Sequence, residues 1–139
     1  MNWPRSSTLI YFAVLVTPAV AGDHAWHCMT PDQVTTHEVH GDNLALGKIK
    51  ITEREGQLAD VPVIHITFVA TNHGSKDFHV VMEVLGSSEM GPVFAMSVEP
   101  AFAGTVSPNA EQPATGAVFA QPGELSRVTK VCIKFEGDF

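Results

Sequence analysis

The chain has 139 residues, of which 45% are hydrophobic and 17% are charged, and its formal net charge is −7. This length suits one domain with a hydrophobic core of its own. Because 15 acidic residues outnumber 8 basic ones, the composition argues against nucleic acid or an anionic membrane surface as a partner.

The first 21 residues are typical of a cleaved export signal. Arg5 lies in a short polar start, an apolar run extends from Leu9 to Val16, and the small-x-small triplet Ala19-Val20-Ala21 follows. A membrane anchor would need about 20 apolar residues in a row, and this run ends at Val16. We therefore expect residues 1–21 to be a signal peptide. The mature chain would then be periplasmic or secreted, without a membrane anchor.

A histidine-rich segment, residues 22–43, follows the predicted cut. A new amino terminus Gly22-Asp23-His24 would offer a free amine, two backbone amides and an imidazole. These four nitrogens form the in-plane set that Cu(II) prefers, and further imidazole and thioether groups nearby suit copper as well. The candidate metal ligands are Gly22, Asp23, His24, His27, Met29, His37 and His40. The alternative is a solvated segment without a fixed metal geometry.

The stretch from His37 to His40, "HEVH", is one residue shorter than the spacing of a zinc-protease motif. Its β-branched neighbours favour a strand, in which residues three apart face opposite ways. We therefore expect no catalytic zinc site here.

Residues 44–139 are expected to form an antiparallel immunoglobulin-like β-sandwich. Apolar and polar residues alternate with period two, as in half-buried strands, and turn-forming residues separate these segments. The expected strands include Leu44–Glu53, Val61–Ala70, Phe78–Leu85, Val93–Val98, Thr115–Ala120 and Ser126–Phe135. Seven or eight short strands in about a hundred residues favour this all-β fold, and a small barrel is the alternative.

The alternation also predicts which side chains meet. Ile64, Ile66 and Phe68 should face the core together. The turn "NHGSKD" predicts a hairpin between the second and third expected strands, and this pairing would place His65 near Glu83 on the outer face.

The two cysteines, Cys28 and Cys132, are expected to form a disulfide. An exported chain meets an oxidising compartment, where two cysteines usually pair. The bridge would close a loop of about a hundred residues, worth up to roughly 4–5 kcal/mol in the chain-entropy model. Cys132 shares a strand face with Lys130 and Lys134, so the amino-terminal segment should lie across the outside of the sheet or along its edge.

The sequence offers no motif that predicts an enzyme. The stretch "GSSEMG" lacks the second glycine of a nucleophile elbow, and Glu53 and Glu55 are expected in a solvated turn. We therefore expect a non-enzymatic binding or accessory protein that acts through another exported protein. The alternative is a copper-binding protein that uses the Gly22-Asp23-His24 terminus, with copper as its cofactor.

Overall fold

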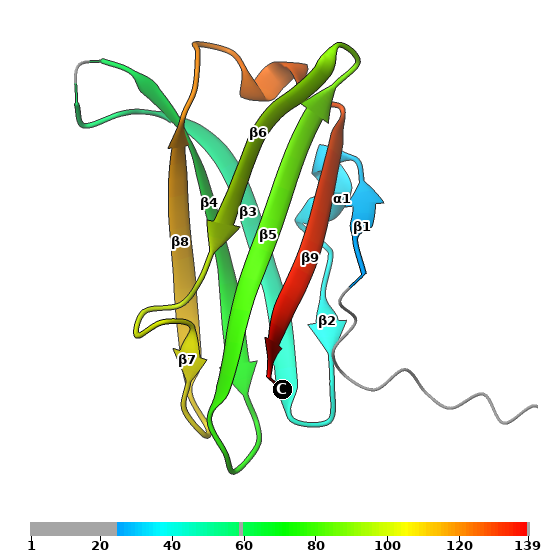
Figure 1. The fold of residues 1–139 in the computed structure, drawn as a ribbon, viewed down its shortest axis with the longest axis vertical. Coiled ribbons are helices and arrows are strands. Elements are labelled where there is room, and N and C mark those ends of the chain that lie inside the picture. Colours follow the sequence, from blue (N-terminus) through cyan, green and yellow to red (C-terminus); the bar gives the residue numbers. More distant parts are fainter. Residues whose placement is uncertain (1–24, 59, 139) are drawn as a thin grey trace, which may run out of the picture.

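The computed structural model describes residues 25–58 and 60–138, which form two antiparallel β-sheets (Figure 1). The predicted all-β class is confirmed. Neither of the two helices in these ranges is long and apolar enough to cross a membrane. The first sheet contains β1 (His27–Met29), β9 (Lys130–Asp138), β5 (Phe78–Ser88) and β6 (Gly91–Val98) in that order, and β7 (Thr105–Val106) pairs with β5. The second sheet contains β2 (Val39–His40), β3 (Leu44–Glu55), β4 (Pro62–Asn72) and β8 (Glu111–Phe119), and the helices are α1 (Pro31–Val34) and the 3-10 helix η1 (Leu125–Arg127).

The inner faces of the two sheets share one hydrophobic core. Because side chains alternate along a strand, every second residue along most of β4, β5 and β9 is buried. Phe68 of β4 and Phe135 of β9 meet edge to face across the sheets, with ring centroids 5.5 Å apart. The buried residues of these strands include Ile64, Ile66, Phe68, Val80, Met82, Val84, Val131, Ile133 and Phe135. The predicted inward faces are therefore confirmed.

Strand β3 contains an irregularity that the alternation did not predict. Leu44 and Leu46 are buried, and the next buried side chain is Ile49, three residues further on. The pairing with β4 shifts between Gly47 and Lys50, and Lys48 takes a left-handed backbone conformation with φ 53°. One extra residue in a strand reverses the facing of all that follow. The bulge therefore keeps both halves of β3 facing the core.

The predicted hairpin at "NHGSKD" is wrong. Strand β4 pairs with β3 and β8, whereas β5 pairs with β9, β6 and β7 in the other sheet. The chain therefore crosses between the sheets here, and His65 lies beside Thr52 and Ala117 instead of Glu83.

The side chain of Asn72 stabilises this crossing. This side chain is buried, and its Nδ2 donates hydrogen bonds to the carbonyl oxygens of Lys76 (2.8 Å) and Val106 (2.9 Å). Its Oδ1 accepts a hydrogen bond from the Gly74 N–H at 2.8 Å. These three bonds fix the loop in the crossing conformation and attach it to the other sheet through β7.

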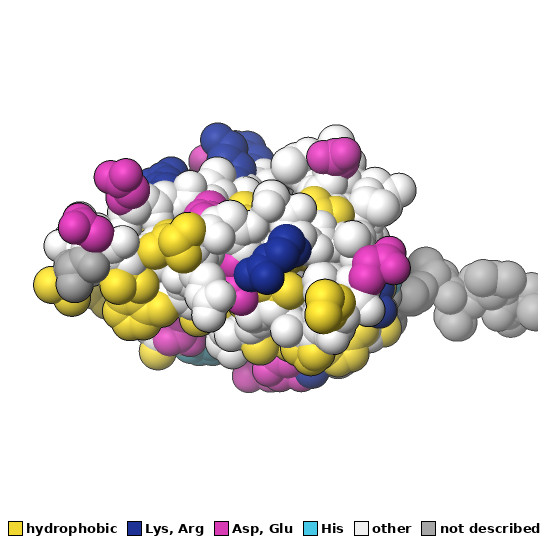
Figure 2. Space-filling view, turned by 90° about the horizontal axis from the view of Figure 1, so that it is seen from above, with side chains coloured by type: hydrophobic (Ala, Val, Ile, Leu, Met, Phe, Trp, Pro, Cys, Tyr) yellow, Lys and Arg dark blue, Asp and Glu magenta, His cyan; other side chains and the backbone are white. Residues whose placement is uncertain are grey.

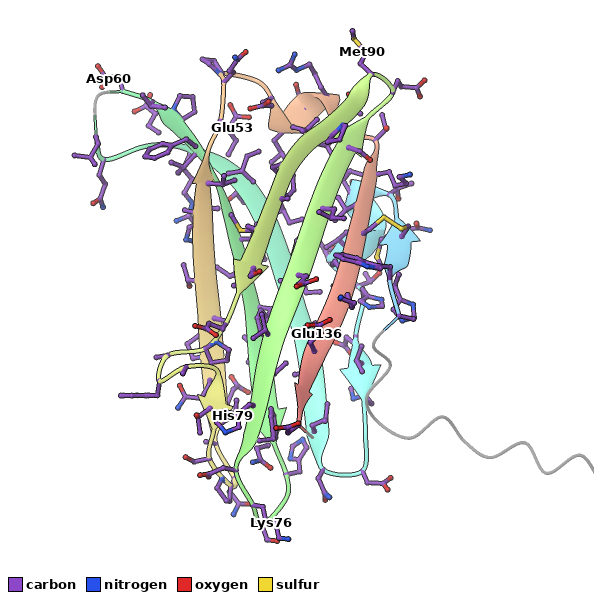
Figure 3. The ribbon with its side chains drawn as sticks, in the orientation of Figure 1. Glu53, Asp60, Lys76, His79, Met90 and Glu136 are labelled. Atoms are coloured by element: carbon purple, nitrogen blue, oxygen red, sulfur yellow. A yellow bond between two sulfur atoms is a disulfide. The ribbon has the colours of Figure 1, made fainter. Side chains whose placement is uncertain are left out.

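At the opposite end, the chain crosses between the sheets again from β8 to β9, and Glu53 holds this connection (Figure 3). Its two carboxylate oxygens accept hydrogen bonds from the backbone N–H groups of Gly123 (2.7 Å) and Leu125 (3.0 Å). The expectation that Glu53 belongs to a solvated turn is therefore wrong. Its side chain faces the space between the sheets because Glu53 is paired with the buried Ile64.

Candidate functional site

The amino-terminal strand β1 is attached to the edge of the first sheet by the predicted disulfide, which is confirmed. Cys28 lies directly opposite Cys132 in the pairing of β1 with β9, and their Cα atoms are 4.0 Å apart. The bridge joins residues 104 positions apart in the sequence. Both cysteines face outward, as expected for Cys132, since its neighbours Val131 and Ile133 are buried.

Because Cys28 faces outward, His27 and Met29 face the other side of β1, where they pair with Ile133 and Val131. The chain then turns back through α1. Proline is the first residue of this helix, and the Thr30 N–H donates a hydrogen bond to Oε1 of Gln33 at 3.0 Å. Helix α1 thereby returns the chain towards β1.

The turn through α1 places His37 beside His27. Their ring centroids are 5.5 Å apart and their planes are inclined by 38°. The buried Val34 anchors the turn, and its carbonyl oxygen accepts a hydrogen bond from the His37 N–H at 3.1 Å. Two predicted ligands from opposite ends of the turn therefore meet.

The environment of His37 favours a neutral imidazole. Burial lowers the pKa of His37, and the nearby His27 lowers this pKa further through charge repulsion. The Nε2 atom of His37 is buried, and it has no hydrogen-bond partner in the described part of the chain. A neutral imidazole has one nitrogen with a free lone pair, which is the form that binds metal ions.

Of the other predicted metal ligands, the structure describes Met29 and His40. Gly22, Asp23 and His24 lie outside the described residues. Met29 packs partly buried against the core. His40 is exposed on β2, and its Nε2 lies 2.8 Å from a carboxylate oxygen of Glu38. Within residues 25–58 and 60–138, no three His, Cys, Asp or Glu side chains gather into a metal site.

Trp26 lies on the outer face of the first sheet, beside the disulfide. Its ring is 5.0 Å from the Nζ atom of Lys134. That Nζ also binds Glu83, at 3.1 Å, and Glu136. Hydrogen bonds to the carboxylates of Glu136 and Glu83 raise the pKa of Lys134, and the bond to Glu136 has the larger effect. Because β1 is only three residues long, Trp26 and the disulfide together help to hold it against β9.

Exposed apolar side chains gather at the tip of the β3–β4 hairpin, and we call Leu58, Val61 and Phe119 the hairpin-tip patch. Leu58 is 72% exposed and Phe119 is 69% exposed. Phe119 belongs to this tip because it pairs with Val63, two residues after Val61. Figure 2 shows hydrophobic side chains gathered around the same tip.

The sequence contains a signal for this patch. Leu58 and Val61 are apolar residues inside the turn "EGQLADVP", where polar residues are usual. Phe119 follows the half-buried Val118, so the alternation of β8 places its large ring on the outer face.

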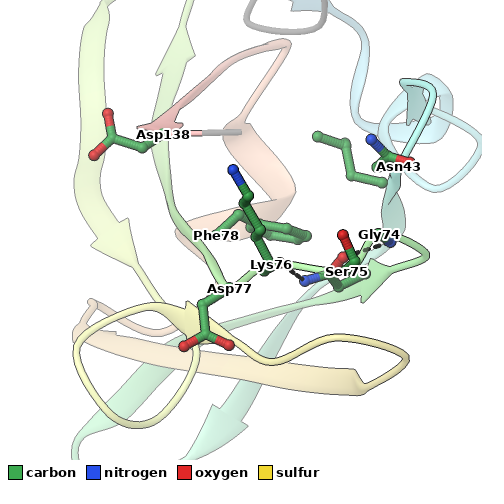
Figure 4. A pocket seen from close by; sticks show the side chains of 9 residues that line it. Asn43, Gly74, Ser75, Lys76, Asp77, Phe78 and Asp138 are labelled. Carbon is green, nitrogen blue, oxygen red and sulfur yellow. Dashed lines mark hydrogen bonds between the residues drawn. The ribbon is translucent and has the colours of Figure 1, made fainter.

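The opposite end of the molecule contains a depression of about 460 Å³ beside Asn72, lined by polar and apolar residues (Figure 4). Its lining includes Lys76, Asp77 and Asp138. In Figure 4 the two carboxylates point in different directions, so they do not converge on one ligand position.

Comparison of the chain with protein-family models, with curated proteins and with solved structures found no match.

Proposed function

We propose that this chain is an exported, non-enzymatic binding or accessory protein that acts through a protein partner. We assign the partner to the hairpin-tip patch, and the exposure of Leu58, Val61 and Phe119 at one tip is the observation that carries this assignment. We also propose that the sandwich is of the immunoglobulin-like type, in which loops at the ends of the sheets bind partners.

The disulfide supports the proposed export. Disulfides form and persist in oxidising compartments, and Cys28 and Cys132 are joined. The proposed signal peptide, residues 1–21, lies outside the described residues.

The chemistry of the patch favours a protein over a small molecule. Aromatic side chains are enriched at protein interfaces, where a few large residues carry most of the binding energy. The tip also exposes charged side chains, among them Arg54 and Asp60. An apolar centre beside polar residues is the usual organisation of a protein interface.

Site-specific photocrosslinking in the native host tests this proposal. A photoreactive phenylalanine analogue replaces Phe119, and the matched control places the same analogue at Phe102, another exposed phenylalanine (84%) on a different loop. We expect one discrete crosslinked product from position 119 and none of that size from position 102.

A second substitution links the product to the patch. Changing Leu58 and Val61 together to serine should abolish the product, while the denaturation midpoint of the purified protein stays the same because both side chains are exposed. Equal products from positions 119 and 102, or a product unaffected by these substitutions, would contradict the proposal.

A further inference from the structure

We propose that His27 and His37 bind one monovalent copper ion between their imidazole rings. This site is independent of the proposed partner binding, because His27 lies on β1 and His37 follows α1, whereas the hairpin-tip patch lies on the β3–β4 loop and β8. It also differs from the predicted Gly22-Asp23-His24 chelate, which would hold Cu(II) through backbone amides.

The separation of the two rings suits a shared metal ion. A metal–nitrogen distance of about 2.0 Å, with the ring centre about 1 Å further on, places the centroids of two ligating imidazoles about 5–6 Å apart. The centroids of His27 and His37 are 5.5 Å apart. The separation of the two rings is therefore already within the range that two imidazoles on one metal ion require.

The number and type of ligands favour Cu(I). A structural zinc site usually takes four protein ligands, and the described residues bring together no three His, Cys, Asp or Glu side chains. Cu(I) is stable with two imidazoles and also accepts a thioether. Met29 lies on the same side of β1 as His27, two residues further along, so this partly buried methionine is a candidate for a third ligand.

Both histidines are held in place before any metal arrives. His27 lies next to Cys28, whose disulfide fixes β1 to β9. His37 is held by its backbone bond to the anchored Val34. The buried Nε2 of His37 has no partner among the described residues, and a metal ion would satisfy it. An aromatic pair that served only to pack would gain nothing from leaving this nitrogen unsatisfied.

A competition titration tests the site. All proteins carry His24→Ala, which removes the terminal chelate, and Cu(I) is titrated against a chromophoric Cu(I) chelator under anaerobic conditions. His27→Ala and His37→Ala should each weaken Cu(I) affinity by about tenfold or more, since even residues that only support a metal ligand cost roughly 10–100-fold. The matched control is His40→Ala, an exposed histidine on β2, and it should leave the affinity unchanged.

Two further measurements keep the test decisive. If His37→Ala does not fold, His37→Gln retains most of the side-chain volume without the imidazole and should show the same loss. X-ray absorption of the Cu(I) protein should show scattering from two imidazoles. The proposed site would be wrong if the His27→Ala, His37→Ala and His40→Ala variants had equal Cu(I) affinities. It would also be wrong if the His24→Ala parent did not bind Cu(I). Crosslinking at Phe119 is a separate readout, so failure of the copper site leaves the partner proposal standing.

Discussion

Asn72 is the buried polar residue that the fold depends on most clearly. Two hydrogen bonds of its side-chain amide lie within the β4–β5 connection, and the third reaches β7. An amide can donate to the carbonyl oxygens of Lys76 and Val106 and accept from Gly74, whereas a carboxylate can only accept. The identity of this side chain therefore decides whether the crossing is stable.

We predict that Asn72→Asp lowers the free energy of unfolding by at least about 2 kcal/mol at neutral pH, since the new carboxylate would face two carbonyl oxygens in a buried position. Urea denaturation measures the change. The control is Asn43→Asp, the same chemical change at an exposed residue of the same depression, with an expected effect within about 0.5 kcal/mol. Similar losses in both variants would show that the added charge, and not the lost donor, is responsible.

Among the secondary-structure elements, β1 depends on a covalent bond more than any other strand. Three residues pair with β9, which is too few to hold this strand by hydrogen bonds alone. The disulfide between Cys28 and Cys132 supplies the missing attachment. Because both cysteines face outward, the bridge can be broken without opening the core.

We predict that reduction lowers the free energy of unfolding by up to about 4–5 kcal/mol, the chain-entropy value for a loop of this length. The far-UV circular dichroism signal of the two sheets should remain, because the disulfide lies on the outer face and the core side chains point inward. Chemical denaturation with and without dithiothreitol measures the loss. A Cys28→Ser, Cys132→Ser double variant should match the reduced protein and show no response to dithiothreitol. An unchanged midpoint on reduction would mean that β1 is held by its other contacts.

The long strands could be predicted from the sequence, but their partners could not. Period-two alternation identified the inward residues of β4, such as Ile66, because it reports which side of a strand is buried. The alternation carries no information on which strand lies beside a given strand. The sequence therefore predicts β4 and β5 as a hairpin, although they belong to different sheets. The deciding feature was the buried Asn72, which the alternation does not distinguish from an ordinary turn residue.

The candidate sites show the same division. The disulfide was predictable because two cysteines in an oxidising compartment have one possible partner each. The histidines near the amino terminus were identified as a group, but the meeting of His27 with His37 depends on the four-residue helix α1, which is too short to leave a periodic pattern. The role of Glu53 could not be predicted from its neighbours, because its two backbone partners, Gly123 and Leu125, lie about seventy residues further along the chain.

At the scale of the whole molecule, the two sheets are joined by a shared core and by chain crossings at both ends. Asn72 stabilises the crossing from β4 to β5, and Glu53 stabilises the crossing from β8 to β9. Two sheets connected in this way should unfold together, since separating them would expose the apolar inner face of each to water.

We therefore predict that the slowest-exchanging amide hydrogens of β4 and of β5, the central strands of the two sheets, report the same free energy of opening. That value should equal the global free energy of unfolding from denaturation. Amides of β1 and β2, which are short edge strands, should exchange at lower free energies, and those of β1 should fall further after reduction. Native-state hydrogen exchange measured by NMR as a function of urea makes this comparison. If β4 and β5 reported different values, the sheets would be separate cooperative units, and the crossings at Asn72 and Glu53 would connect them without coupling their stability.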